Sequence, residues 1–346
     1  MTNEAHDAPA DFSTPDQVFS SLMGHVSSAV LKAALDFNVF DLIAGGTDDL
    51  DGLVRAVAVP ERGLRIVLDA LIGLGFLEKP ADRYCLRPLA AAFLVKSSGA
   101  YLGGMAAVMG HPLLWERMAR LTDIVRRGGV AGEGNPANRE SDPFWAVFAE
   151  ASRGISVPQA ALIAEVVKPE RFPRAKILDL ACGSGIYGFT MLGRAGSEAS
   201  LTSVDWPNVL DRARETAAEW QMLDRIEWRP GSIFDVDFGS GYDIAIASQI
   251  YHHFDLEQNL AFSRRVLASL RPGGELVIAD AVPDERRAER PFPLVFAVVM
   301  LATTDHGDTF TFTQYRRLLE QAGFTDVVLH APPMMPSQII TARRPG

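Results

Sequence analysis

Apolar residues in the first third of the chain recur at the spacing of amphipathic helices. The clearest stretch repeats at i, i+3, i+4, i+7 and i+8 and comprises Leu64, Val67, Leu68, Leu71 and Ile72. Glycines end this helix, and two strand-like runs, residues 76–79 and 83–86, follow around a Pro-Ala-Asp turn. Helices followed by such a hairpin predict a winged helix.

The pattern changes from Lys176 onward, where short apolar runs alternate with helical stretches. This alternation is typical of a parallel sheet with crossover helices, and it predicts an α/β domain after the helical one. The candidate strands are residues 176–181, 201–205, 225–229, 242–248 and 275–280, with two closing runs at 326–330 and 338–342.

Charge and composition exclude several functions. The chain has 346 residues, 48% of them hydrophobic, which is enough for two domains, and its net charge of −10 repels phosphate backbones. A winged helix can bind DNA, but residues 1–100 hold 8 Lys and Arg against 13 Asp and Glu. We therefore expect no nucleic-acid partner, and a dimerisation role for this domain.

Targeting signals are not expected either. The first residues are acidic and polar, unlike a secretory leader, and the longest apolar stretch, residues 291–302, is too short to span a bilayer. The two cysteines, Cys85 and Cys182, form no paired motif and fit a reducing compartment. These features predict a cytoplasmic protein with no membrane partner.

A glycine-rich turn follows the first strand of the second half. The strand ILDLA runs into CGSGIYG, residues 182–188, where bare backbone can pack against a ligand and the next helix presents its N-terminal amides. Asp205 ends the next strand about 20 residues later, where a carboxylate can accept both hydroxyls of a ribose. Together these features predict a nucleotide or adenosyl site.

The same glycines satisfy G-x-G-x-x-G, so a nicotinamide dinucleotide is the alternative ligand. Three observations favour a methyl donor. Asp179 is placed to organise the glycine turn and to meet an ammonium through water. The fifth strand follows LRPGG, residues 270–274, a turn typical of methyltransferases. The motif also lies in mid-chain, whereas dinucleotide folds usually open with it.

Five stretches carry a family resemblance: LDLACGSG, VDWP, RPGSIFD, DIAIASQIYHHFD and LRPGGELVIAD. Together they resemble the class I small-molecule methyltransferases with a winged-helix dimerisation domain, the O-methyltransferase type of plants and bacteria. The resemblance implies a Rossmann-like seven-stranded methyltransferase sheet, S-adenosylmethionine as donor, a homodimer, and a small-molecule acceptor bound between two domains. We expect a dimerisation domain over 1–105 and a catalytic domain over 106–346, in which a helical linker, 106–170, lines the acceptor pocket.

The resemblance also implies a donor-binding set. Gly183 and Asp205 match donor-binding positions of the family, and its adenine-contacting stretch falls on Ser232 and Ile233. The family usually has aspartate at Ser232, so the contact to the adenine amine is expected to be weaker or different. Trp206 can stack beside the adenine or anchor the surface. The expected donor-binding residues are Asp179, Gly183, Gly185, Asp205, Trp206, Ser232, Ile233 and Ser248.

A histidine pair follows the fourth strand. In the O-methylating relatives a histidine here removes the acceptor's hydroxyl proton, and His252 matches it. The family has His-Asp at this point, whereas this chain has His252-His253. Two glutamates orient the histidine in relatives, and the matching positions here are Asp280 and Thr309. One of the two orienting acids is therefore missing.

A third histidine, His306, lies in TTDHGD, residues 303–308. A histidine pair and a distant histidine can form a metal site that leaves positions open for a chelating substrate. The alternative is a solvated loop histidine. We expect His252 and His306 to bind a divalent transition metal such as Fe, Zn, Ni or Co, with His253 as the third ligand or the base.

Arg153 lies in a stretch that lines the acceptor pocket in this family. Its guanidinium can hold a carboxylate, and a surface salt bridge is the alternative. With the histidines, Arg153 resembles the metal-dependent C-methyltransferases that methylate the β-carbon of α-keto acids for unusual amino acids. In this hypothesis the metal stabilises an enolate, Arg153 holds the carboxylate, and Asp280 orients the histidines.

Two other functions stay open. One is metal-free O-methylation of a phenol or hydroxylated polyketide, with His252 as base, which would survive a chelator. The other is a catalytically silent dimeric regulator, which would need a blocked donor site. The intact glycine turn and Asp205 argue against the regulator.

Overall fold

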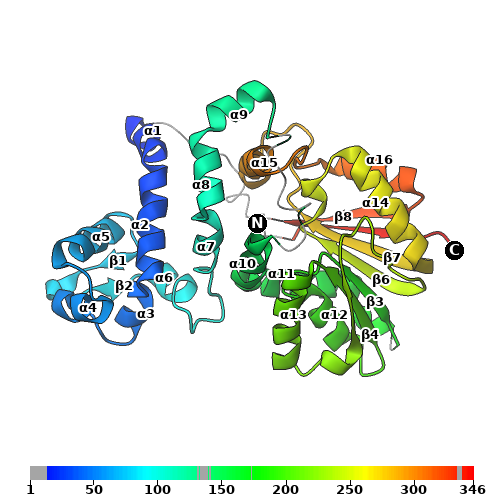
Figure 1. The fold of residues 1–346 in the computed structure, drawn as a ribbon, viewed down its shortest axis with the longest axis horizontal. Coiled ribbons are helices and arrows are strands. Elements are labelled where there is room, and N and C mark those ends of the chain that lie inside the picture. The colour runs from blue at the N-terminus through cyan, green and yellow to red at the C-terminus, as the bar shows by residue number, and fades with distance from the viewer. Residues whose placement is uncertain (1–13, 131, 133–138, 140–141, 173, 333–336) are drawn as a thin grey trace, which may run out of the picture. The chain divides into compact units, whose positions relative to one another are not determined.

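The computed structural model describes residues 14–130, 132, 139, 142–172, 174–332 and 337–346. The chain divides into two compact units, one reaching Trp115 and one running from Glu116 to Gly346 (Figure 1). The predicted domain boundary at residue 105 stays a prediction. Residues 1–13 of the expected first domain, and 131, 133–138, 140 and 141 of the expected linker, lie outside the described residues.

The first unit is mostly helical and carries a small hairpin. Its α5 buries Leu64, Leu68 and Leu71, which confirms the predicted amphipathic face. The hairpin strands β1 and β2 pair antiparallel around a short turn, as the winged-helix pattern predicts. The elements are α1 Pro15–Leu22, α2 Gly24–Asp36, α3 Val39–Ala44, α4 Leu50–Val57, α5 Glu61–Gly73, β1 Leu77–Glu78, β2 Cys85–Leu86, α6 Pro88–Phe93 and α7 Met105–Met109, followed by α8 Pro112–Ala119, which crosses the boundary.

The second unit holds a seven-stranded mixed sheet in the order β5-β4-β3-β6-β7-β9-β8. The first five strands run parallel, and β9 is antiparallel to both β7 and β8. All seven predicted strands are present. They are β3 Lys176–Leu180, β4 Ser200–Asp205, β5 Ile226–Pro230, β6 Tyr242–Ser248, β7 Leu270–Asp280, β8 Thr325–His330 and β9 Gln338–Arg343.

Helices cover both faces of this sheet and enclose two apolar layers (Figure 1). One layer packs beneath α11, α12 and α13 and includes Ile163, Phe189 and Leu210. The other packs beneath α14 and α16 and includes Phe262 and Leu318. Both faces of the central strands are therefore buried, which explains their unbroken apolar runs. The helices are α9 Leu121–Arg127, α10 Pro143–Ala151, α11 Arg153–Val167, α12 Ile186–Arg194, α13 Pro207–Glu219, α14 Leu256–Ser269, α15 Pro291–Thr303 and α16 Phe312–Ala322.

One strand begins earlier than its sequence pattern predicts. The LRPGG stretch is not a free turn, because β7 starts at Leu270 and pairs there with Tyr242. The register then shifts, so that Ile244 pairs with Glu275. Gly274 lies in this bulge, where an added Cβ would stand 2.8 Å from the carbonyl oxygen of Tyr242. The glycines therefore allow a bulged strand in place of a turn.

The direction of strand addition reverses between β3 and β6. In parallel α/β sheets such a switch point opens a crevice at the carboxyl ends of the strands, where ligands bind. Ala181 and Gln249, which follow these two strands, have φ values of +54° and +57°. Strained backbone of this kind is typical of functional sites. The fold therefore predicts a ligand site at the edge of the sheet where β3, β4, β6 and β7 end.

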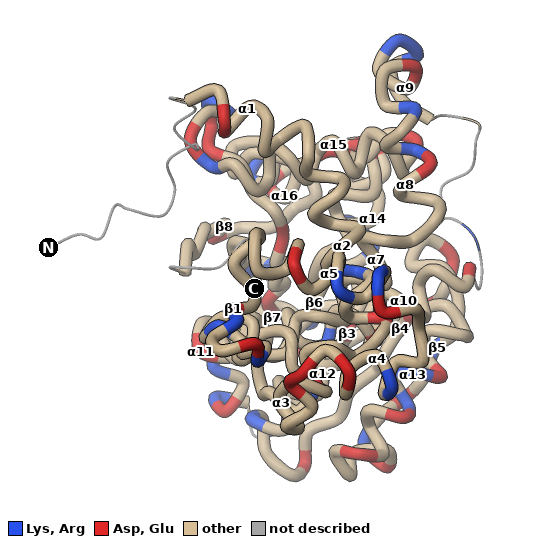
Figure 2. Tube along the Cα trace, turned by 90° about the vertical axis from the view of Figure 1, so that its left-hand side faces the viewer, with Lys and Arg blue, Asp and Glu red and all other residues tan. Residues whose placement is uncertain are grey.

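Charged residues are interspersed along the described trace (Figure 2). On α13, for example, Arg212 pairs with Glu215 and Arg214 pairs with Asp211, each three residues apart. Within the described ranges, no single helix has the length and apolar character needed to cross a membrane, and only the bent pair α1 and α2 meets those two criteria jointly.

Candidate active site

Two carboxylates hold the glycine turn between β3 and α12. Asp179 accepts a hydrogen bond from the Gly188 amide at 3.0 Å, and Asp205 accepts from the Gly183 amide at 2.8 Å and the Trp206 amide at 2.7 Å. A Cβ on Gly188 would stand 2.6 Å from the Asp179 carboxylate. Only glycine therefore lets α12 approach the acid so closely, and Gly185 caps the start of this helix.

A pocket opens beside this turn. Four residues of the expected donor-binding set line it: Asp205, Trp206, Ser232 and Ile233. Ile250 and Phe254 also line it, and sequence reasoning missed them, although both lie in the segment that follows β6. The Ser232 hydroxyl accepts a hydrogen bond from the Phe234 amide at 3.1 Å, so this serine has a structural partner in the loop. The pocket has the apolar walls and the single acid that an adenosine needs.

Burial raises the pKa of both carboxylates that hold the glycine turn, Asp179 and Asp205. It raises the pKa of Asp179 to about 8. The hydrogen bond from the Gly188 amide lowers this pKa, whereas the charge of Asp205 raises it. Burial also raises the pKa of Asp205 to about 6, and the Gly183 and Trp206 amides oppose the change. A positively charged ligand would favour the ionised form of both acids.

Other polar groups lie near these acids. The Tyr187 hydroxyl donates to Gln159 at 2.5 Å, which joins α12 to α11. Burial raises the pKa of Tyr187, and the charges of Asp179 and Asp280 act in the same direction. The Gln159 amide nitrogen and the Ser248 hydroxyl are buried without a hydrogen-bond partner among the described residues. Sequence reasoning included Ser248 but missed Gln159, which lies on α11 outside any motif, and Tyr187, which lies within the glycine-rich stretch 182–188.

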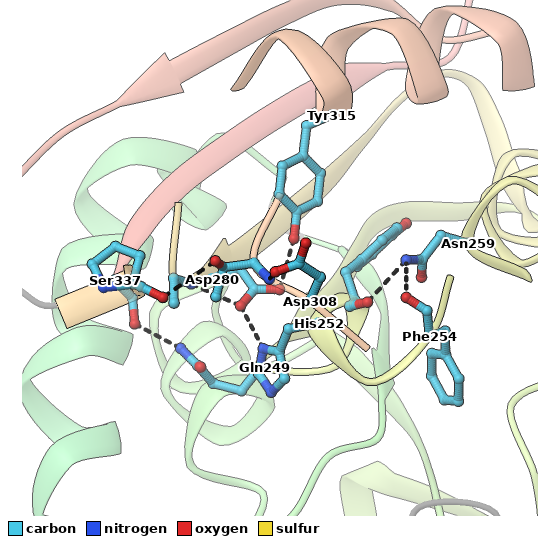
Figure 3. Close-up of polar contacts among 12 residues, drawn as sticks. Gln249, His252, Phe254, Asn259, Asp280, Asp308, Tyr315 and Ser337 are labelled. Atoms are coloured by element: carbon cyan, nitrogen blue, oxygen red, sulfur yellow. Dashed lines mark hydrogen bonds and ion pairs between the residues drawn. The ribbon is translucent and has the colours of Figure 1, made fainter. Parts of the chain in front are cut away.

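A buried chain of hydrogen bonds holds His252 (Figure 3). The Nδ1 atom of His252 lies 2.5 Å from Oδ1 of Asp280, and Oδ2 of Asp280 accepts from the Tyr315 hydroxyl at 2.7 Å. The Ala281 amide donates to Oδ1 as well. With Nδ1–H committed to the carboxylate, the remaining nitrogen, Nε2, is the one available to take a proton. Sequence reasoning named His252 and Asp280 but missed Tyr315, which lies 35 residues beyond Asp280.

The charge of Asp280 fits this arrangement. Complete burial works to raise the pKa of its carboxyl group, but the attraction of His252 and the hydrogen bonds from His252, Tyr315 and Ala281 lower it. Asp280 is thus a buried carboxylate that fixes the ring orientation of the histidine.

The backbone that carries the histidines is fixed locally. His252 and His253 end a short helical turn, Tyr251–His253, which follows β6. The Asn259 amide on α14 donates to the carbonyls of Tyr251 and Phe254 and so closes this turn (Figure 3). Gly307 packs against the backbone carbonyl of His252, a position that leaves no room for a side chain.

Aromatic rings flank both histidines. Phe296 of α15 meets the His252 ring edge-on at 4.9 Å between centroids, and Trp145 of α10 meets the His253 ring edge-on at 5.3 Å. Phe292 stacks on Phe296 with an interplanar angle of 8°. The two imidazole centroids are 4.5 Å apart. Burial, and then repulsion from His252, holds the pKa of His253 well below its ordinary value.

The predicted metal site does not form. Among the described residues, no three His, Cys, Asp or Glu side chains gather in an arrangement that could hold a metal ion. His306 is exposed at the surface of its loop, whereas His252 is buried against Asp280. The expectation that His252, His253 and His306 converge on a metal is therefore not supported, since His306 is exposed and the other two rings lie together in the interior.

Two further candidate positions have partners in the structure. Arg153 forms an ion pair with Glu219 at 2.7 Å and lies 3.7 Å from Glu150, which is the salt-bridge alternative considered for it; its role toward an acceptor carboxylate stays a prediction. Thr309, the match to the second orienting acid, donates its hydroxyl to the Pro293 carbonyl at 3.2 Å. The second support of the pair comes instead from Tyr315, which acts on Asp280.

A Rossmann-like sheet with a glycine turn, an acid at the end of the second strand, and a histidine–aspartate pair beside the pocket define the class of S-adenosylmethionine-dependent methyltransferases. Comparison with protein families gives the family. Residues 133–325 match the O-methyltransferase domain, and residues 19–96 match the O-methyltransferase dimerisation domain. The chain belongs to this O-methyltransferase family, and the dimerisation domain supports a homodimer.

Individual relatives agree with this assignment. The tetracenomycin polyketide synthesis 8-O-methyl transferase of Streptomyces glaucescens is 29% identical over 90% of this chain and 92% of its own length. A crystal structure from Nostoc punctiforme, described as an O-methyltransferase, is 31% identical and superposes with a TM-score of 0.89 over 95% of this chain and 99% of its own. Human N-acetylserotonin methyltransferase, solved with S-adenosylmethionine, shares the fold at 22% identity, with a TM-score of 0.85 over 98% of this chain and 100% of its own.

These findings bear on the two chemistries predicted from the sequence. Both matching family models are those of O-methyltransferases, and the Streptomyces relative is named for transfer to oxygen. They favour the O-methylating alternative over metal-assisted methylation of an α-keto acid. They support S-adenosylmethionine as the donor and give no support to a transition metal.

Proposed function

We propose that this chain transfers a methyl group from S-adenosylmethionine to the hydroxyl of an aromatic small molecule of secondary metabolism. The main support for this proposal is the buried His252–Asp280 pair. Nδ1 of the histidine is hydrogen-bonded to the carboxylate, so Nε2 is the nitrogen that can act as the base. The tetracenomycin relative acts in polyketide synthesis, and this supports an aromatic polyketide as the acceptor.

The donor is expected at the carboxyl ends of β3 and β4. Asp205 would accept the ribose hydroxyls, and the walls formed by Trp206, Ile233 and Phe254 would enclose the adenine. Asp179, a buried acid that accepts a hydrogen bond from the Gly188 amide, would face the ammonium of the amino-acid end. When bound, S-adenosylmethionine supplies an electrophilic methyl group on a positively charged sulfur.

His252 then performs the acid–base step. Its Nε2 removes the hydroxyl proton as the acceptor oxygen becomes nucleophilic, and the negative charge of Asp280 stabilises the imidazolium that forms. Tyr315 holds the second oxygen of Asp280 and keeps the carboxylate turned to the histidine. The rings of Phe296 and Trp145 beside the two histidines would pack on a planar aromatic acceptor.

A kinetic experiment tests this role. Purified protein is incubated with S-adenosylmethionine and a panel of aromatic hydroxy compounds, and the His252→Ala variant is compared with wild type. We expect kcat to fall about 10²- to 10⁴-fold, the usual contribution of a general base. The affinity for S-adenosylhomocysteine, measured by calorimetry, should stay unchanged. A variant that retains full turnover would contradict the proposal.

A further inference from the structure

We propose that His253 selects acceptors whose reacting hydroxyl stands next to a second oxygen, such as a hydroxyl peri to a quinone carbonyl. This inference rests on the proposed function, since it assigns an acceptor class to the site where His252 acts as the base. It concerns a residue at which this chain departs from the His-Asp pattern described above.

The two imidazoles are held side by side. Their centroids are 4.5 Å apart and their planes are tilted by 45°. Asp280 fixes the ring of His252 through Nδ1, while Trp145 packs edge-on against the ring of His253 at 84°. Neither ring can turn away without losing these contacts, so the geometry of the pair is set before an acceptor arrives.

His253 has an unused polar atom. Its Nδ1 is shielded from solvent and has no hydrogen-bond partner among the residues that the structure describes. Buried polar groups in folded proteins nearly always have partners, and an exception calls for a ligand or another specific reason. Asp280 pairs with Nδ1 of His252, whereas Nδ1 of the neighbouring His253 ring has no such partner among the described residues.

The spacing of the pair limits what can satisfy it. Rings this close reach atoms on neighbouring positions of one acceptor, whereas a second oxygen at the far end of a fused ring system would lie beyond His253. An imidazole carries at least one N–H donor in either protonation state, so a carbonyl or hydroxyl oxygen is a suitable partner.

This placement solves a chemical difficulty of such acceptors. A hydroxyl peri to a carbonyl donates an internal hydrogen bond to that carbonyl, and this bond resists removal of the proton. An N–H of His253 donates a hydrogen bond to the carbonyl oxygen in place of the acceptor's own hydroxyl. The hydroxyl proton then passes to Nε2 of His252, the phenolate oxygen bonds to the methyl carbon, and the electrons of the broken carbon–sulfur bond return to sulfur.

Two isomeric acceptors test the inference. One is hydroxyanthraquinone with the hydroxyl peri to the carbonyl, and the other carries the hydroxyl at the distant β position. We expect wild type to methylate the peri isomer with the higher kcat/KM. His253→Phe keeps a ring but no N–H, and it should lower kcat/KM for the peri isomer about tenfold or more, since sites built to hydrogen-bond a substrate discriminate strongly. Turnover of the β isomer should change little.

A second variant separates hydrogen bonding from packing. His253→Asn removes the ring but keeps an N–H donor, so it should restore part of the preference for the peri isomer. Binding of S-adenosylhomocysteine checks that each variant is folded. Equal losses for both isomers in His253→Phe, or a wild-type preference for the β isomer, would overturn the inference and leave the role of His252 standing. Turnover of neither isomer and of no simple phenol would overturn the proposed function as well.

Discussion

The candidate site has two parts that are built in different ways. We call the part around Asp179 and Asp205 the donor edge, and the part around His252, Asp280 and Tyr315 the histidine edge. At the donor edge, Asp179 and Asp205 hold backbone amides of the glycine turn, and the residues involved lie 9 and 22 positions apart. At the histidine edge, side chains hold side chains: His252 and Asp280 are 28 residues apart, and Tyr315 lies 35 further on. The donor edge thus depends on main-chain geometry, whereas the histidine edge depends on the identity of three side chains.

This difference predicts that the two edges can be disabled separately. Substitutions at the histidine edge should reduce turnover and leave donor affinity intact, whereas substitutions at the donor edge should act on affinity first. A residue that changes both quantities in proportion would break the comparison.

Among the residues that support His252, the largest effect is expected from Asp280→Asn. An amide cannot stabilise the imidazolium of His252, and it can turn the ring toward the wrong tautomer, so kcat should fall about 10²- to 10³-fold. Single-turnover kinetics with saturating S-adenosylmethionine measures this loss. A rise in the dissociation constant of S-adenosylhomocysteine by a similar factor would show that the two edges are not separate.

Asp205→Ala should weaken donor binding about 10- to 100-fold, because hydrogen bonds to a charged group contribute about 1.5–3 kcal/mol. It would remove the ribose partner and the anchor of the Gly183 amide. Calorimetric titration with S-adenosylhomocysteine gives the affinity. Asp211→Ala is the matched control, since this exposed aspartate on α13 pairs only with surface arginine in the described structure. Equal affinities for the two variants would contradict the assignment.

The same difference explains what could be predicted from the sequence. The strands and the glycine turn were predictable because apolar periodicity and glycine spacing are local signals, and Asp205 is the last residue of its strand. Tyr315 and Trp145 carry no local signal, since they reach the histidines only through the packing of α16 and α10. The metal hypothesis lacks support for a related reason: the sequence shows that His306 exists, but only the three-dimensional packing decides whether its ring reaches the other two, and in the structure it is exposed.

Tyr315→Phe should have a smaller effect, with kcat reduced by about 10-fold or less, because one hydrogen bond to Asp280 is lost while the contact to His252 stays. Tyr242→Phe is the control. Its hydroxyl is equally buried, and it bonds to Thr202 and to the Phe238 carbonyl, away from the histidines. Both variants should lose stability in thermal unfolding, but only Tyr315→Phe should lose turnover. Equal kcat values for the two variants would contradict a role of Tyr315 in supporting His252 and Asp280.

The smallest expected effect is a pH dependence of folding stability that arises from the buried acids of the donor edge. Burial raises the pKa of Asp179 from 3.8 to about 8, so below pH 8 the folded donor-free chain keeps a proton that the unfolded chain releases. Stability of the donor-free protein should therefore fall as pH rises toward about 8. Asp205, with a pKa of about 6, contributes in the same direction at lower pH.

Thermal unfolding between about pH 6.5 and 8 measures this dependence, and the expected change in Tm is a few degrees. Asp179→Asn should flatten the profile, because the amide has no proton to release. Saturating S-adenosylmethionine should also flatten it in the wild type, since its ammonium favours the ionised carboxylate. An unchanged slope in Asp179→Asn would assign the pH dependence to other groups.

The most direct test of the central claim locates the transferred methyl group. The protein is given S-adenosylmethionine with a deuterated methyl group and an aromatic hydroxy acceptor, with and without a metal chelator, and the product is examined by mass spectrometry and NMR. We predict the label on oxygen, at equal rates in both samples and in His306→Ala. A label on carbon, or transfer that stops with the chelator, would contradict a metal-free base at His252.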